Sequence, residues 1–273
     1  MTLKAEFFTV TILGCGSSGG VPRIGNIWGS CDANNPKNRR RRCSILIQAG
    51  HAASDETTNI LIDTGCDVRE QLLDANVANL DAVFYTHEHA DHVHGIDDLR
   101  VLALSCKKRL EVYMAQACAK HVMSAFSYCF NTPAGSDYMP ILNANLIFDG
   151  EITTINGAGG SIEIEAFLQI HGNINSLGFR VGDLAYSCDL SALPSSSHKL
   201  LKGLKMWIID ALRYKTHSCH LNVEQSLALV KEIGADQALL TNMHIDLDYD
   251  TLCNELPSHI RPAYDGFQIK MRL

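Results

Sequence analysis

Thr86-His87-Glu88-His89-Ala90-Asp91-His92 directly follows the apolar run DAVFY (81–85). His87 and His89 are two residues apart, and in an extended chain such positions point to the same side, so both imidazoles can reach one metal ion. Asp91 and His92 stand where a helix would begin, and they can be aimed at a second ion. Imidazole suits Zn²⁺ or Mn²⁺, and a carboxylate widens the choice of metal. The stretch therefore predicts a metal site rather than a His-rich polar loop in which Asp91 caps a helix.

Two ions need more ligands than these four, and further candidates stand at the ends of other apolar runs. His171 ends IEIEAFLQI (162–170), Asp189 follows LAYSC (184–188), and His244 follows QALLTNM (237–243). Each could lie on the same rim of a sheet. Taken alone, each residue could equally be a hydrogen-bonded polar residue or a turn cap.

Short apolar runs and amphipathic segments alternate along the chain, which favours an α/β fold. The runs predicted as strands are 7–13, 44–48, 59–63, 81–85, 110–114, 162–170, 177–181, 206–210 and 237–241. The segments predicted as helices are 67–77, 95–106, 115–130 and 222–234. In the last of these, Asn222 stands at the cap and Gly234 at the stop. Without a fixed-period repeat or a long linker, residues 1–273 are expected to form a single domain built from two layered halves.

Composition excludes several classes of protein. The chain has 273 residues, of which 46% are apolar and 19% charged, which is ordinary for a globular domain. Its net charge of −7 argues against a bulk polyanion binder. The 10 Cys include no C-x-x-C pair, and no run of about 18 apolar residues predicts a membrane span. The N-terminus lacks a signal-peptide layout, so we expect a cytoplasmic protein with free thiols.

Two further stretches are ambiguous. Gly14-Cys15-Gly16-Ser17-Ser18-Gly19 matches G-x-G-x-x-G, but the residues that follow include Pro22, Gly25 and Gly29 and cannot form the helix that a dinucleotide site requires. The glycines are expected to let the backbone pass close to another loop or a site. The run Arg39–Arg42 is either a solvated loop or a positive field beside an anionic substrate.

The order H-x-H-x-D-H, a single His, a single Asp and a final His resembles the metallo-β-lactamase superfamily over nearly the whole chain. The resemblance implies an αββα four-layer sandwich with two divalent ions, Zn²⁺ or Mn²⁺, at one rim. It implies that His87, His89 and His171 bind the first ion, that Asp91, His92 and His244 bind the second, and that Asp189 bridges them.

Three stretches look like the phosphodiesterase branch of that superfamily: LGCGSSGGVPRIG (13–25), RRCS (41–44) and HADHVHGIDDLR (89–100). This branch contains phosphoribosyl cyclic phosphodiesterases, and ribonuclease Z is more distant kin. The resemblance hints at a homodimer. A structural zinc held by a Cys cluster is not expected, because the matching stretch offers only Cys31.

The resemblance also implies catalytic roles. His220 in YKTHSCHLNVEQSLAL (214–229) matches a proton donor of the family, and His217 is the alternative residue for that role. Asp91 is expected to be both a catalytic residue and a metal ligand. Asp63 in LIDTG matches an Asp that supports a ligand. The expected reaction is attack by a metal-bridging hydroxide on a small cyclic or nucleotide-type phosphodiester.

Other functions stay open. The fold also serves non-hydrolytic proteins of cofactor biosynthesis or ligand binding, and tRNA 3′-processing nucleases. A nucleic-acid substrate is not favoured, because the chain shows no separate Gly- and Lys-rich arm, and no membrane partner is expected. A thioesterase of the glyoxalase type is disfavoured by the short segment of 29 residues (273 − 244) after His244.

Overall fold

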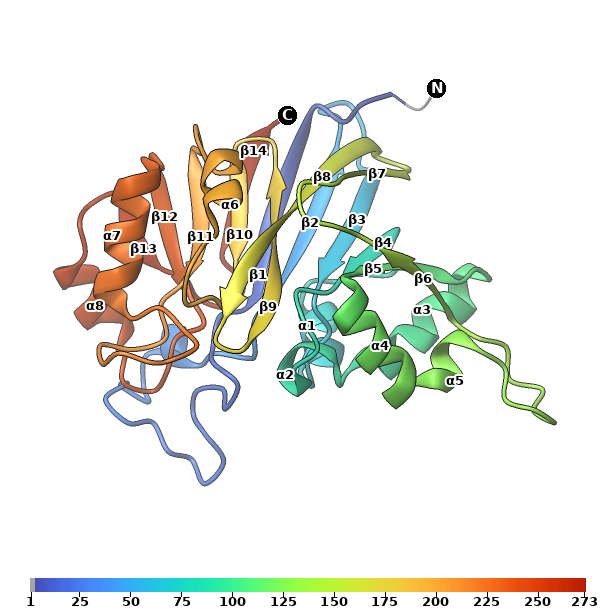
Figure 1. Ribbon diagram of the computed structural model, residues 1–273, viewed down its shortest axis with the longest axis horizontal. Helices are drawn as coiled ribbons and strands as arrows, with labels where there is room; N and C mark the ends of the chain where they lie inside the picture. Colours follow the sequence, from blue (N-terminus) through green and yellow to red (C-terminus); the bar gives the residue numbers. More distant parts are fainter. Residues whose placement is uncertain (1–2) are drawn as a thin grey trace.

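The computed structural model describes residues 3–273, and two seven-stranded sheets form its centre (Figure 1). The first sheet contains, in spatial order, β14 (Gln268–Arg272), β1 (Phe7–Gly14), β2 (Ser44–Gly50), β3 (Thr57–Ile62), β4 (Ala82–Phe84), β5 (Leu110–Met114) and β6 (Leu142–Leu146). The second contains β13 (Ile260–Pro262), β12 (Gln237–Thr241), β11 (Met206–Asp210), β10 (Leu184–Ser187), β9 (Ile174–Val181), β8 (Gly160–His171) and β7 (Ile152–Gly157).

Helices flank the two sheets on opposite sides of the molecule (Figure 1). Beside the first sheet lie α1 (Val68–Asp74), α2 (Ala90–Val93), α3 (Leu99–Cys106), α4 (Gln116–Ala125) and α5 (Ser127–Phe130). Beside the second lie α6 (Ser195–Leu200), α7 (Val223–Ile233) and α8 (Tyr249–Glu255). This is the predicted αββα sandwich, and the expectation of the fold class is confirmed.

Strand β2 shows why the sequence folds into layers. Ile45 and Ile47 point into the core between the sheets, whereas Leu46 points into the core under the helices, and all three are buried. Alternate side chains of a strand face opposite ways, so an uninterrupted apolar run is buried on both faces. The inter-sheet core extends from Phe8 on β1 to Phe167 on β8 and Trp207 on β11, and it therefore joins the two halves of the chain.

All nine apolar runs form strands, and each segment predicted as a helix contains one. Asn222 caps α7 in a capping box with Gln225, and Gly234 ends that helix at a φ of 76°, as the sequence predicted. Two of the predicted helices are interrupted. A 3₁₀ turn (Ile96–Asp98) precedes α3, and a break at Phe126 separates α4 from α5.

The loop that follows β1 passes close to residues 40–42. A Cβ on Gly14 would lie 2.0 Å from the carbonyl oxygen of Arg42, and one on Gly16 would lie 2.9 Å from that of Arg40. The expectation that these glycines allow a close backbone approach is confirmed, and the segment after β1 forms no dinucleotide-binding helix among the described residues.

The run Arg39–Arg42 is not the positive field that was one of the two expectations. Arg40 is 1% exposed and donates to the Asn38 side chain. Arg41 forms ion pairs with Asp74 and Asp265, and Arg42 pairs with Asp67. Two of the four arginines therefore neutralise carboxylates within the fold, Arg40 is buried against neutral partners, and only Arg39 is exposed. Over residues 3–273, the structure contains no helix long and apolar enough to cross a membrane.

Candidate metal centre

The predicted site residues gather at one rim of the sandwich, where strands from both sheets end. His87 follows β4 in the first sheet, while His171 ends β8 and Asp189 follows β10 in the second. Strands β8 and β10 both pair antiparallel with β9, so they run in the same direction and their carboxyl ends meet at the same edge. The sheet topology thus brings together residues that are far apart in the sequence.

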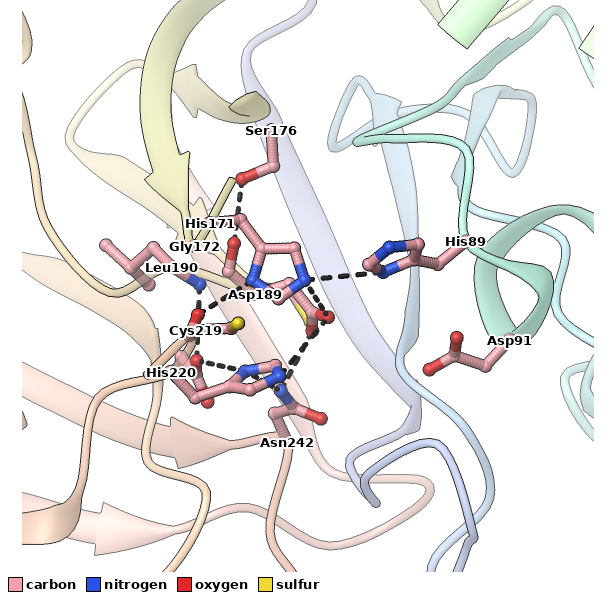
Figure 2. A network of polar contacts seen from close by, with 12 residues as sticks. His89, Asp91, His171, Gly172, Ser176, Asp189, Leu190, Cys219, His220 and Asn242 are labelled. Atoms are coloured by element: carbon pink, nitrogen blue, oxygen red, sulfur yellow. Dashed lines mark hydrogen bonds and ion pairs between the residues drawn. The ribbon is translucent and has the colours of Figure 1, made fainter. Parts of the chain in front are cut away.

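Four side chains form the first group of the centre. Ligand atoms of His87, His89, His171 and Asp189 all lie within 4.8 Å of one another. The Nε2 atoms of His87 and His171 lie 3.6 and 3.5 Å from Oδ2 of Asp189. His87, His171 and Asp189 are almost fully buried, and His89 is exposed. Figure 2 shows His89 and His171 facing each other beside Asp189.

A second group of ligand-type side chains lies beside Oδ1, the other oxygen of the Asp189 carboxylate. Nε2 of His92 is 3.6 Å from Oδ1 of Asp189 and 3.4 Å from Oδ2 of Asp91. Asp91 and His92 belong to α2, as expected from their place after the strand. Asp189 therefore stands between the two groups, with Oδ2 toward the three imidazoles and Oδ1 toward His92.

The buried imidazoles are oriented as metal ligands require. Nδ1 of His171 donates to the carbonyl oxygen of Cys219 at 2.7 Å, and Nδ1 of His92 lies 2.7 Å from Oδ2 of Asp63. Each ring thus uses Nδ1 outside the centre and turns Nε2 toward Asp189, which is how protein partners fix a metal-binding tautomer. Burial lowers the pKa of His87 well below its ordinary value, and the nearby imidazole of His92 lowers it further. These donors fit divalent metal ions.

Asp63 supports the centre from behind, as its place in LIDTG predicted. It is fully buried, and its carboxylate accepts hydrogen bonds from the backbone and the hydroxyl of Thr86 at 2.9 and 2.8 Å. Burial opposes a charge on His92, but the carboxylates of Asp189, Asp63 and Asp91 raise the pKa of that imidazole well above its ordinary value.

His220 lies in the same pocket, in contact with a residue that the sequence analysis missed. Nδ1 of His220 is 2.9 Å from Oδ2 of Asp210, and its Nε2 is 4.0 Å from Oδ2 of Asp189. Asp210 is fully buried at the end of β11. Burial disfavours the charged imidazole, but the hydrogen bond to Asp210 raises the pKa of His220 to about 9. The signal for Asp210 was a carboxylate directly after the apolar run MWII (206–209).

His217 and His244 do not belong to either group. His217 is exposed and its Nδ1 accepts from the backbone of Cys219, although it also lines the pocket. The metal-type groups found among residues 3–273 do not include His244, whose imidazole contacts Arg23 and lies 3.1 Å from Asp246. Five of the seven predicted ligands belong to these groups, Asp91 lies beside them through its contact with His92, and His244 lies outside.

The pocket over the centre has a volume of about 400 Å³. It is lined by Ser17, Ser18, His89, Ala90, Asp91, His171, Asp189, Leu212, His217, Cys219, His220 and Asn242. The glycine-rich loop thus contributes Ser17 and Ser18 to the pocket, in agreement with the expectation that its backbone passes close to a site.

Comparison with known proteins gives a consistent result. Residues 58–245 match the family model of the β-lactamase superfamily domain. An octanoyltransferase of Porphyromonas gingivalis is 30% identical over 262 residues, which are 94% of this chain and 50% of that protein. The chain therefore spans about half the length of that relative.

Solved structures show the same fold. The crystal structure of a diphosphatase of the PhnP family has a TM-score of 0.85 and 30% identity, with 100% of this chain and 99% of that one covered. The short form of human tRNase Z has a TM-score of 0.66 and 16% identity, with 96% and 98% covered. With this sandwich, a His/Asp cluster at its rim and the matching family model, the chain belongs to the β-lactamase superfamily.

Proposed function

We propose that the protein is a metal-dependent hydrolase, and that it is a phosphodiesterase acting on a small cyclic or nucleotide-type phosphodiester. One observation carries the proposal: a single carboxylate, Asp189, lies against two groups of ligand-type side chains and against His220 in one pocket. Bound divalent ions supply Lewis acidity for a charged phosphorus centre and lower the pKa of water. His87, His89 and His171 would hold one ion, Asp91 and His92 the other, and Asp189 both.

His220 is placed to donate a proton. Its raised pKa keeps the imidazole protonated at neutral pH, and Asp210 holds the proton on Nδ1. The proton on Nε2 then faces the pocket, where a leaving alkoxide of high pKa needs one. A phosphodiester with a ribose or alkyl leaving group makes this demand, which is why the Asp210–His220 pair favours such a substrate.

Cationic groups beside the pocket favour an anionic substrate. Arg23 packs against Gly19, next to Ser18 in the pocket lining, and its guanidinium contacts His244. Burial lowers the pKa of His244, and the charges of Arg23 and Arg213 lower it further against the opposing effect of Asp246. Arg23 and Arg213 thus place two permanently charged guanidiniums close to His244, and Arg213 directly follows Leu212 of the pocket lining.

The similar diphosphatase of the PhnP family also supports a phosphoryl substrate, at 30% identity over the whole chain. The octanoyltransferase name belongs to a relative of about twice this length, so acyl transfer is an alternative to be tested and not a second proposal.

The test is a substrate screen with metal-free protein and with Mn²⁺ or Zn²⁺ added separately. Cyclic nucleotides and bis(p-nitrophenyl) phosphate should be hydrolysed, and p-nitrophenyl phosphate and p-nitrophenyl octanoate should be poor substrates. The matched control is Asp189→Asn, which should be inactive on every substrate. Preferred turnover of the monoester or of the octanoate would contradict the proposal.

A further inference from the structure

The position at the end of β12 differs from what the resemblance implied. His244 was expected there as a ligand of the second ion, yet the residue that reaches the pocket is Asn242, which directly follows Thr241. The His244 ring is held instead by Asp246, whose backbone amide donates to its Nδ1 at 3.3 Å and whose Oδ2 lies 3.1 Å from the same atom. The backbone amide of His244 donates to Leu212, which fixes the segment.

The Asn242 side chain is oriented by its partners. Its Nδ2 donates to Oδ1 of Asp189 at 2.8 Å and lies 3.1 Å from Nδ1 of His220 (Figure 2). Its Oδ1 accepts from the Cys43 thiol at 3.9 Å. A carboxylate can only accept a hydrogen bond here and a thiol can donate one, so this network assigns the amide nitrogen to Asp189. Asn242 thus presents a donor, not a ligand atom, to the centre.

Asn242 donates to Oδ1 of Asp189, which is the carboxylate oxygen that faces the second group. Oδ1 of Asp189 accepts from Asn242 and also from the Cys188 thiol at 3.0 Å, so its lone pairs are shared before any cation arrives. The second group has one imidazole, two carboxylates and the Cys188 thiol, whereas the first has three imidazoles and Oδ2 of Asp189. The Cys188 thiol keeps its proton on Oδ1 of Asp189, and burial raises its pKa well above the ordinary value, so it offers no thiolate to a cation. Imidazole-rich sites suit Zn²⁺, and carboxylate-rich sites suit Mn²⁺ or Mg²⁺.

We propose that Asn242, and not His244, fills the position at the end of β12, and that the centre is therefore unequal, with one firmly held ion at the first group and a weakly held, exchangeable ion at the second. This inference rests on the two-ion centre of the proposed function. It adds that the second site prefers a harder metal than the first and that its affinity is limited by the amide of one residue.

The test measures metal binding and needs no substrate. Metal-free wild type is titrated with Zn²⁺ and with Mn²⁺ by calorimetry, then desalted and analysed for its elemental content. We expect two classes of site, with about one equivalent retained after desalting because only the first group is rich in imidazole. Asn242→His is the decisive variant. The residue has a φ of 59°, which histidine tolerates better than most side chains, so the backbone can accept it.

Asn242→His should tighten the weak class by roughly 10- to 100-fold, the scale on which neighbours of metal ligands change affinity, and retain a second equivalent. His244→Ala should leave both classes as in wild type, with the exposed His121→Ala as the control for histidine removal.

Two ions of equal affinity in wild type, or loss of the weak class in His244→Ala, would overturn the inference. Unequal binding with no hydrolysis of any phosphodiester would refute the proposed function and leave this inference standing. Hydrolysis of a phosphodiester by a protein that holds two equally firm ions would refute this inference and leave the proposed function standing.

Discussion

Oδ2 of the buried Asp210 lies 2.9 Å from Nδ1 of His220, which lines the pocket. Asp210 ends β11, and His220 lies in the loop that leads to α7. The buried carboxylate also accepts from the backbone of Leu190 at 3.2 Å. This contact gives His220 a fixed ring orientation and a stable charge, which are the two properties that a proton donor needs.

The effect of His220→Ala should depend on the leaving group. A general acid contributes on the order of 10²–10⁴ in rate when the departing oxygen is a poor leaving group. The variant should lose activity by that amount on a cyclic nucleotide and keep far more on bis(p-nitrophenyl) phosphate, because p-nitrophenolate leaves without a proton. Metal content should not change, and equal losses on both substrates would assign His220 a positioning or ligand role. Asp210→Asn should show the same pattern more weakly.

Asp189→Asn should lose one or both metal ions and nearly all activity. The substitution keeps the size of the side chain and suits the φ of 54° at this position, but it removes the negative charge that two cations share. Elemental analysis after reconstitution measures the loss, and the melting temperature of the metal-free variant checks the fold. Full metal content with wild-type turnover would show that Asp189 is an ordinary turn residue.

Arg23→Ala should weaken the use of anionic substrates without loss of metal. A hydrogen bond to a charged group contributes about 1.5–3 kcal/mol, so kcat/KM for a phosphodiester should fall on the order of 10- to 100-fold. Arg39→Ala is the matched control, because Arg39 is an exposed arginine of the same long loop. If both variants lose activity equally, the general charge of the loop and not a contact at Arg23 is responsible.

Asp248→Ala should destabilise the protein by about 0.5–2 kcal/mol, the range for loss of a helix cap. Asp248 caps α8 through the Thr251 amide, and it also accepts from the Asp32 backbone and from Nδ2 of the buried Asn38. Urea unfolding at neutral pH measures the loss, with the exposed Asp55→Ala as the control.

The same carboxylate predicts a pH dependence. Burial opposes its charge, but hydrogen bonds from the Thr251 and Asp32 amides lower the pKa of Asp248 to about 2. A pKa that folding lowers stabilises the native state at pH values above the unfolded pKa of about 4. The stability difference between wild type and Asp248→Ala should therefore be constant at neutral pH and shrink as the pH falls from about 4 to 2. A difference that is unchanged at pH 2 would refute this origin.

Hydrophobic periodicity and the residues that begin and end helices predicted the central strands and the main helices, but not the edge strands. The four edge strands β6, β7, β13 and β14 were all missed. An edge strand packs less of its surface, and β14 alternates between exposed and half-buried residues, so its sequence QIKMR carries little apolar signal. The short β10 is not predicted as a strand, because its four residues are too few for a periodic pattern.

The site residues could be predicted where a ligand directly follows a strand. They could not be predicted where two nearby polar side chains could each reach the same position in the pocket. His87 and His89 could be assigned from spacing alone, because an extended chain turns both the same way. Asn242 and His244 have the same two-residue spacing, and the sequence favoured the better ligand type. The chain turns at Asn242 in the left-handed region, which breaks the alternation and sends the two side chains to different neighbours.

The residues of the centre come from both sheets, so a cation bound there would link the two halves of the fold. His87 and His92 come from the half of the chain that builds the first sheet, and His171 and Asp189 from the half that builds the second. A cation bound by both halves must be released before the sheets can separate, so binding free energy adds directly to the resistance of the sandwich to opening. Metal supply would then govern how long each molecule survives heat and proteolysis, quite apart from whether it turns over substrate.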